Sequence, residues 1–136
     1  MLDEHGNLSR AAFYLRHNED YISVCQMSVV SWMSDIHSIP ETINRKLYGY
    51  CVLNVLDIRN LALMIKSHKL IFEVCEKHTP TNKSHAGIYI LLDNSTIKGD
   101  RNNILKNIPE DVPASTLAMR YQRRLLDIAE KKVVVF

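Results

Sequence analysis

Two neighbouring segments of strand character constrain the fold of this chain more than any other feature. Residues 69–77 alternate apolar and polar side chains, which is the pattern of a sheet with one solvated side. Residues 86–92 form the most uniformly apolar stretch of the sequence, and the loop 78–84 between the two segments is rich in turn-forming residues. We therefore predict an antiparallel hairpin whose second strand is central in its sheet.

The other elements are predicted from hydrophobic spacing. Strands are expected at 21–27 and 48–55, where β-branched and aromatic residues gather. Short helices are expected at 28–39 and 57–65, because apolar residues recur there every three or four positions. The segment 40–46 is predicted to be a helical turn or a loop.

The C-terminal part of the chain predicts one long amphipathic helix. It follows an irregular connector, residues 93–113, and ends near residue 132; residues 133–136 are expected to pair as an edge strand or to pack as a tail. The stripe at helical spacing consists of Leu117, Tyr121, Leu125 and Ile128.

These elements together favour the α+β class. We expect a small mixed or mainly antiparallel sheet of about four to five strands, with helices packed on one face and a long C-terminal helix. The length of 136 residues, of which 46% are hydrophobic, fits one globular domain spanning residues 1–136.

Charge and apolar runs limit the classes of partner. The 17 basic and 15 acidic residues give a formal net charge of +2, which argues against binding to bulk DNA and leaves a local patch for RNA or a nucleotide. No apolar run is long enough to span a membrane, and the acidic N-terminus is unlike a secretory signal. Three cysteines without a C-x-x-C pattern are expected to be reduced core thiols, so we predict a cytoplasmic protein.

The common cofactor and hydrolase motifs are missing from the sequence. The four glycines are not spaced as a phosphate-binding loop of either familiar type, and neither G-x-S-x-G nor H-E-x-x-H occurs. No cofactor is predicted. The best metal candidate is Cys75, His78 and His85, which are ligand types that zinc accepts, but a fourth ligand is not evident. Two loop histidines beside a buried thiol are the favoured interpretation, and no metal is predicted.

A second set of polar residues suggests phosphate chemistry without a metal. Histidine transfers protons and arginine binds phosphate charge in small ribonucleases and in phosphate-transfer domains. In this chain His85, His78 and Arg59 are the candidate catalytic residues, and Arg16, Asp20 and Ser23 are the candidate ligand-binding residues. Ser9 and Arg10 belong to the same N-terminal region. The favoured alternative is that these arginines are solvated or paired with neighbouring carboxylates.

Two further features have both a functional and a structural interpretation. The predicted terminal helix carries Arg120, Arg123 and Arg124, which suit a nucleic-acid backbone but more often form a solvated face with pairs such as Arg123 with Asp127. Met27, Trp32 and Met33 lie near one another in the sequence, and they are expected to belong to the core rather than to a partner-binding patch.

Part of the sequence resembles a group of small bacterial proteins without an assigned activity. The similarity covers about the first 92 residues and least supports the terminal helix. It implies that Arg16, Asp20, Arg59 and His85 form the set to test, and it implies no mechanism. The pattern consists of Ser9, Ala12, Phe13, Arg16, Asp20, Ser23, Val24, Ile58, Arg59, His85, Ala86 and Ile88.

Three hypotheses for the function follow. The leading one is a small cytosolic domain that binds a protein partner or a phosphate-bearing ligand. One alternative is a metal-independent nuclease or phosphate-transfer enzyme with a His/Arg site. The other is an interaction protein of the antitoxin or immunity kind. A phosphate-bearing ligand and the enzyme alternative both require Arg16, Arg59 and His85 to meet at one concave site.

Overall fold

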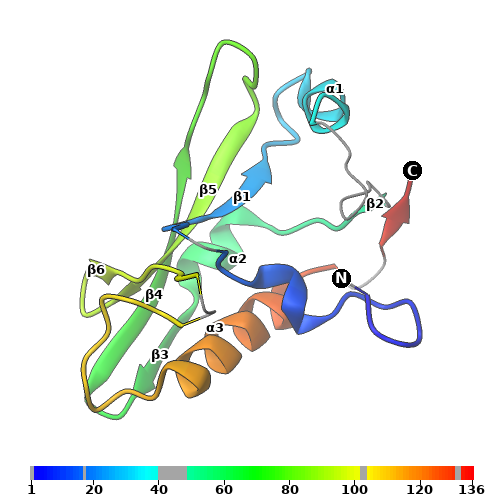
Figure 1. Ribbon diagram of the computed structural model, residues 1–136. Coiled ribbons are helices and arrows are strands. Elements are labelled where there is room, and N and C mark those ends of the chain that lie inside the picture. The colour runs from blue at the N-terminus through cyan, green and yellow to red at the C-terminus, as the bar shows by residue number, and fades with distance from the viewer. Residues whose placement is uncertain (1, 17, 40–48, 102–103, 131–132) are drawn as a thin grey trace.

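The structure is a computed structural model, and it describes residues 2–16, 18–39, 49–101, 104–130 and 133–136. Short helices and strands alternate in the first half of these residues, and the longest helix lies near the C-terminus (Figure 1). They are a 3₁₀ turn η1 (Arg10–Phe13), β1 (Ile22–Cys25), α1 (Trp32–His37), β2 (Gly49–Tyr50), α2 (Val55–Asn60), β3 (Ala62–Ile65), β4 (His68–Glu76), β5 (His85–Leu92), β6 (Ser95–Thr96), α3 (Ala114–Ile128) and β7 (Val134–Val135).

The main sheet has five strands, and every pair in it is antiparallel. The strand order is β1-β5-β4-β3, and β6 pairs with the end of β5. The predicted hairpin is confirmed, because β4 pairs with β5 from Leu70 opposite Leu92 to Glu76 opposite Ala86. The expected α+β class is therefore confirmed, with β5 as the central strand.

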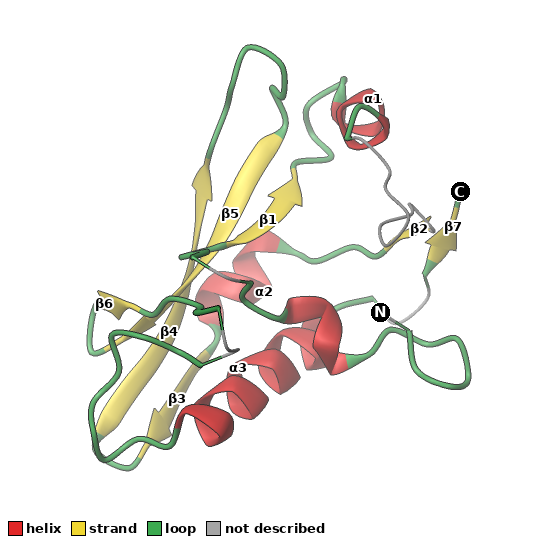
Figure 2. Ribbon diagram, viewed as in Figure 1, coloured by secondary structure: helices red, strands yellow, loops and turns green. Residues whose placement is uncertain are grey.

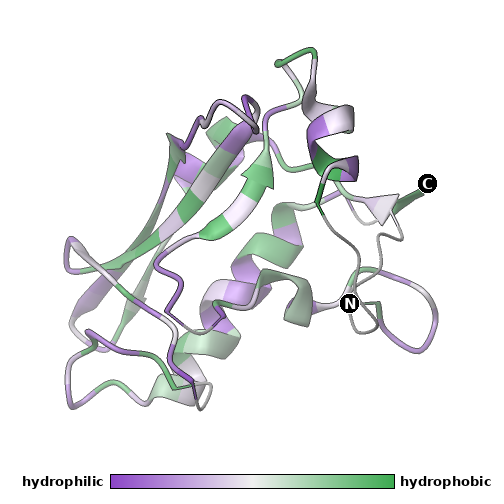
Figure 3. Cartoon of the chain, turned by 45° about the horizontal axis from the view of Figure 1, so that its top comes forward, coloured by the Kyte–Doolittle hydropathy of each residue, from purple (hydrophilic) through white to green (hydrophobic). Residues whose placement is uncertain are grey.

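Helices cover one face of this sheet, which we call the inner face (Figure 2). Phe72 of β4 and Ile88 and Ile90 of β5 point to this face and are buried. The stripe predicted for the terminal helix is also confirmed, since Leu117, Tyr121 and Leu125 of α3 are fully buried in the same cluster of side chains. Figure 3 shows apolar residues alternating with polar ones along α3, as expected of a helix that packs on one side.

The helix predicted at 57–65 is wrong in its second half. Residues 55–60 form α2, and the side chain of Asn54 caps it by accepting a hydrogen bond from the Asp57 N–H at 3.1 Å. The following β3 buries Leu63 and Ile65 and exposes Ala62 and Met64, which is the two-residue period of a strand. The apolar spacing of residues 62–65 fits the period of a helix as well as that of a strand, and the pairing with β4 makes them a strand.

Two further predicted elements are shorter than expected. The helix predicted at 28–39 is formed only at 32–37, after a series of turns in which Trp32 N–H donates to the Val29 carbonyl at 3.0 Å. Of the strand predicted at 48–55, residues 49–55 are described, and among these only 49–50 pair with another strand, which is β7. Residues 51–54 continue without a strand partner among the described residues, and the predicted turn or loop at 40–46 lies outside them.

The connector 93–113 takes part in the core. It contains β6, and it buries Ile97, Leu105 and Val112. The last residues pair as an edge strand, one of the two outcomes predicted for them, because Val134 lies opposite Tyr50. Within the part of the chain that the structure describes, no helix has the length and apolar character needed to cross a bilayer.

Candidate functional site

The structure brings His85 and Ser23 together on the outer face of the sheet, opposite the helices. His85 Nδ1 lies 3.1 Å from the Lys77 carbonyl oxygen, and His85 Nε2 lies 3.4 Å from Ser23 Oγ. Since a carbonyl oxygen only accepts, Nδ1 must carry a proton, and in a neutral ring Nε2 accepts from Ser23. His85 therefore joins the central strand to β1 and to the end of β4.

Aromatic rings and one lysine surround His85. The ring centroid of Tyr21 lies 5.9 Å from that of His85 and 5.3 Å from that of Tyr89. Lys77 Nζ lies 5.4 Å from the centre of the Tyr21 ring and 5.1 Å from that of Tyr89, which suits cation–π contacts. The Tyr89 hydroxyl in the first place, and more weakly the charge of Asp20, raise the pKa of Lys77 and favour its charged form.

Arg59 is not part of this group. Its Nε donates to Glu73 Oε1 at 2.7 Å, and one terminal nitrogen donates to the Val74 carbonyl at 3.0 Å. Glu73 lies opposite Tyr89, four residues along β5 from His85, or about 13 Å at the usual rise per residue. Arg59 thus hydrogen-bonds a β4 carbonyl that lies beyond the end of β3 and has no strand partner there among the described residues. It also pairs with a carboxylate, as the alternative of paired arginines predicted.

The remaining predicted site residues lie at other places. Arg16 lies at the start of a turn, and its backbone N–H donates a hydrogen bond to Glu19 Oε2 at 3.0 Å. His78 Nε2 lies 3.2 Å from Gln26 Oε1 and 3.8 Å from a carboxylate oxygen of Glu76. Among the described residues, no hydrogen bond or ion pair links Arg16, Arg59 or His78 with His85. These contacts therefore do not support the convergence that the phosphate-binding and enzyme hypotheses require.

The metal candidate also lacks the geometry of a site. Cys75 is exposed, because it lies on the outer face while its neighbour Val74 lies on the inner face. The expectation that all three cysteines are core thiols is thus wrong for Cys75, and Cys25 and Cys51 are only partly buried. No three His, Cys, Asp or Glu side chains of the described ranges are grouped so that they could hold a metal ion.

The basic residues of α3 stay exposed. Arg120, Arg123 and Arg124 all lie on the side of the helix that faces away from the core. The predicted pair of Arg123 with Asp127 is absent from the ion pairs that the described part of the chain forms.

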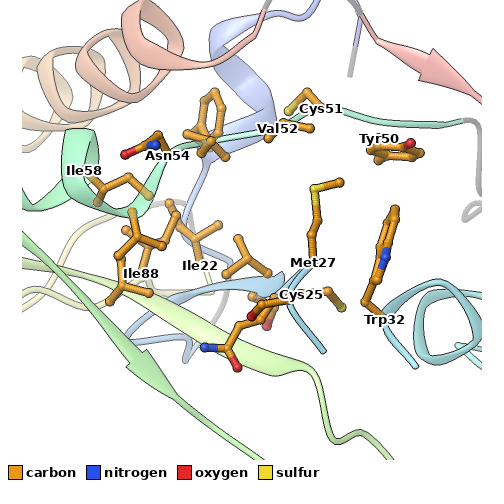
Figure 4. Close-up of a pocket in the computed structure, with 18 of the residues that line it drawn as sticks. Ile22, Cys25, Met27, Trp32, Tyr50, Cys51, Val52, Asn54, Ile58 and Ile88 are labelled. Atoms are coloured by element: carbon orange, nitrogen blue, oxygen red, sulfur yellow. The ribbon is translucent and has the colours of Figure 1, made fainter. Parts of the chain in front are cut away.

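An apolar pocket lies beside β1, with a volume of about 720 Å³. Figure 4 shows its two walls, with β1 and Met27 on one side and Cys51 and Val52 on the other. Its floor reaches the core at Ile88 of the central strand. The lining consists of Ala12, Phe13, Ile22, Ser23, Val24, Cys25, Gln26, Met27, Ser28, Trp32, Ile36, Tyr50, Cys51, Val52, Leu53, Asn54, Val55, Leu56, Ile58, Val74 and Ile88.

The pocket explains two residues that were expected to be core. Met27 is 48% exposed and points into the hollow (Figure 4). Trp32 packs edge-on against Tyr50, with ring centroids 5.1 Å apart, and both rings line the pocket. The expectation that these side chains are ordinary core residues is corrected, because the structure places them around an open apolar space.

A buried carboxylate holds the α1 wall of the pocket in place. Asp35 of α1 is only 8% exposed, and one of its oxygens accepts from the Ser84 hydroxyl at 2.6 Å and from the Ser84 N–H at 3.1 Å. The Ser31 hydroxyl donates to the same oxygen at 3.0 Å. These hydrogen bonds, first of all the one from the Ser84 hydroxyl, lower the pKa of Asp35. The carboxylate therefore ties α1 to the hairpin loop before β5.

Sequence patterns did not reveal a second charged group, at the far end of the sheet. His68 Nδ1 lies 2.5 Å from Asp93 Oδ2, and His68 Nε2 lies 2.9 Å from Asp111 Oδ1. The two carboxylates, first Asp93 and then Asp111, raise the pKa of His68. This histidine links β4 with the β5–β6 turn and with the loop before α3. The residues are far apart in sequence, so no local spacing could have indicated the contact.

Comparison with protein-family models, with curated protein sequences and with solved structures gives no match to this chain.

Proposed function

We propose that this protein is a binding protein and that the apolar pocket beside β1 is where it recognises a protein partner. The observation that supports this most is the pocket itself, whose volume of about 720 Å³ lies within the range of known ligand pockets. Several of its lining residues, such as Phe13 and Ile88, belong to the buried core, so the pocket reaches from the surface to the core.

The chemistry of the lining also supports binding of an apolar group. None of the described lining residues carries a charge, and the polar ones are Ser23, Gln26, Ser28 and Asn54. Large exposed apolar surfaces are uncommon on proteins that bind nothing. A charged or phosphate-bearing ligand would lose its hydration in this pocket without gaining a partner for its charge.

The arrangement of the other predicted residues supports binding over catalysis. A nuclease or phosphate-transfer site would need an arginine within reach of His85, and Arg59 is instead engaged by Glu73 and the Val74 carbonyl. An antitoxin-like or immunity-like role agrees with a binding protein. The three unpaired cysteines fit the reducing environment of the cytoplasm, where we propose that the protein acts.

The pocket proposal is tested with the fluorescent probe anilinonaphthalene sulfonate. Trp32 is the one tryptophan of the sequence and lines the pocket, so its emission reports on occupancy. We expect the probe to quench Trp32 and to shift the methyl NMR signals of Ile22 and Ile88. The proposal fails if the Trp32 emission and these methyl signals do not respond.

Two cysteines provide a matched pair of variants. Cys51→Phe adds bulk inside the pocket, whereas Cys75→Phe adds the same bulk on the exposed outer face. We expect Cys51→Phe to weaken probe binding at least about tenfold and Cys75→Phe to leave it within about twofold, since a filled pocket excludes the ligand. Equal effects of the two variants would contradict the proposal.

A further inference from the structure

β1 is an edge strand, and its open edge lies along the apolar pocket. It pairs with β5 on one side, and no strand of the described residues pairs with its other side. Both edge residues Ser23 and Cys25 line the pocket, and so does Val24 between them. The pocket is therefore bounded on one side by backbone as well as by side chains.

The phase of the backbone hydrogen bonds shows which groups face the pocket. Gln26 N–H donates to the Ser84 carbonyl at 2.8 Å, so the pair of Gln26 and Ser84 is a hydrogen-bonded pair. Such pairs alternate along antiparallel strands, so Ile22 and Val24 also direct their backbone groups to β5. The N–H and C=O groups of Ser23 and Cys25 must then point out of the open edge.

The other side of β5 provides an independent check on this phase. Lys77 N–H donates to the His85 carbonyl at 2.8 Å, which directs the backbone groups of His85 and Gly87 toward β4. Because His85 lies opposite Cys25 in the register of β1 with β5, these two residues are not hydrogen-bonded to each other. The hydrogen bonds on the two sides of β5 therefore agree that the backbone groups of Ser23 and Cys25 are the ones at the open edge of β1.

An apolar occupant that lacked a backbone would leave these groups without partners. Burying an unpaired N–H or C=O group costs about 1–3 kcal/mol in proteins. An extended peptide would instead pair with the edge, and its alternate side chains would continue the inner face of the sheet over Ile22 and Val24. The lining residues that the structure describes carry no charge, so those inward side chains are expected to be apolar and uncharged.

We propose that the occupant of the pocket is an extended apolar segment of a partner protein, which adds to β1 as a sixth strand of the main sheet. This inference rests on the proposed function and adds the conformation and the chemistry of the bound segment. The four residues of β1 offer an edge of about 13 Å, which matches four or five residues of the partner. The open N–H and C=O groups of Ser23 and Cys25 set the register.

The test uses a seven-residue peptide that alternates valine with threonine and carries lysine at both ends, titrated into the full protein with Trp32 as reporter. Two further versions carry N-methyl groups, one on the valines and the other on the threonines. In an extended peptide the N–H groups of the valines all point to one edge of the strand, and those of the threonines point to the other edge. We expect the unmethylated peptide to bind and one methylated version to lose at least about tenfold in affinity. Equal binding by all three peptides would overturn strand addition.

A pair of variants tests the same edge from the side of the protein. Ser23→Pro removes an open N–H without removing a bond to β5, a position where edge strands tolerate proline. Ser23→Ala keeps the N–H. We expect Ser23→Pro to lose at least about tenfold in peptide affinity relative to Ser23→Ala, with circular dichroism unchanged. If Ser23→Pro unfolds the protein, the methylated peptides decide.

The outcomes separate this inference from the proposed function. If anilinonaphthalene sulfonate binds and the peptides do not, the pocket takes small apolar molecules, so strand addition is wrong and the pocket remains a binding site. If neither binds, both proposals fail. If the protein forms a dimer that Ser23→Pro abolishes, the occupant is a second copy of the chain, and the proposal of a partner segment is wrong.

Discussion

The ring of Tyr21 lies directly on Gly87, in the middle of the outer face of the sheet. A β-carbon at Gly87 would lie 2.6 Å from Cδ2 of this ring and 2.8 Å from Cγ. The absence of a side chain on the central strand therefore lets Tyr21 cross it and reach both His85 and Tyr89. The glycine is required by this close approach.

We predict that Gly87→Ala lowers the free energy of unfolding by about 1–3 kcal/mol, because the added methyl group must displace the ring. Urea unfolding measures the change. In Tyr21→Ala the space above Gly87 is free, so adding Gly87→Ala to that variant should cost much less. If the two changes were additive, the contact between the ring and the glycine would not be the cause.

The contact of His68 with Asp93 and Asp111 predicts a pH-dependent stability. Since the pKa of His68 is raised above its ordinary value of 6.5, its contribution is complete below that value and is lost as the pH rises through the folded-state pKa. His68 in turn is the main cause that lowers the pKa of Asp93 below 3.8, so that contribution is lost as the pH falls through the lowered value. The contact should stabilise most between these two limits.

We therefore expect His68→Gln to destabilise the protein more at about pH 5.5 than at about pH 8.5. Urea unfolding at a series of pH values measures this difference. His5→Gln is the control, because the His5 ring pairs with Glu4 and both side chains are exposed. A difference between wild type and His68→Gln that does not change with pH would contradict the assignment.

The Asp35 contact predicts a coupling between a buried carboxylate and the pocket. In Asp35→Asn the charge that accepts three hydrogen bonds is lost, so α1 should be held less firmly to Ser84. We expect the Trp32 emission to move to longer wavelength and the affinity for anilinonaphthalene sulfonate to fall at least about threefold. Ser34→Ala, on the exposed side of α1, is the matched control. An unchanged Trp32 emission in Asp35→Asn would count against this role.

Two buried tyrosine hydroxyls predict opposite effects of the same substitution. The Tyr121 hydroxyl accepts a hydrogen bond from the buried Leu15 N–H at 3.0 Å, so Tyr121→Phe leaves that donor unpaired. We expect a loss of about 1–3 kcal/mol in the free energy of unfolding. The Tyr14 hydroxyl is buried without a hydrogen-bond partner among the described residues, so Tyr14→Phe should be neutral or stabilising. Thermal unfolding of both variants compares them, and equal losses would refute the explanation.

Local pattern was sufficient for the parts of the fold whose period was clear. The alternation in residues 69–77 and the apolar run 86–92 predicted the β4–β5 hairpin, and the stripe through Leu117 and Tyr121 predicted α3. The pattern was ambiguous at 61–65, where the apolar residues fit a helix and a strand equally well. The turn after Ile65 also lacks glycine, and Lys66 itself adopts a φ of 53°.

The candidate site was beyond local pattern for a different reason. The pocket is formed by β1, α1 and residues 50–58, and its shape depends on how these segments are placed by the core. Sequence reasoning selected histidines and arginines because their chemistry is distinctive, and it assigned Met27 and Trp32 to the core because they are apolar. Tertiary packing decides whether an apolar residue faces a filled or an open space. The spacing of apolar residues along the sequence carries no information about it.

The pairing of β1 has a consequence for how the chain folds. Ile65 pairs with His68 across a tight turn, whereas Ile22 pairs with Ile88 from a distant part of the sequence. Strands β3, β4 and β5 are therefore joined by short loops, while β1 adds to them only after a long loop has closed, which is entropically slower. We expect the three neighbouring strands to collapse first and β1 to arrive late in the folding reaction. Until it does, the edge of the central strand is open to any other strand of the nascent chain.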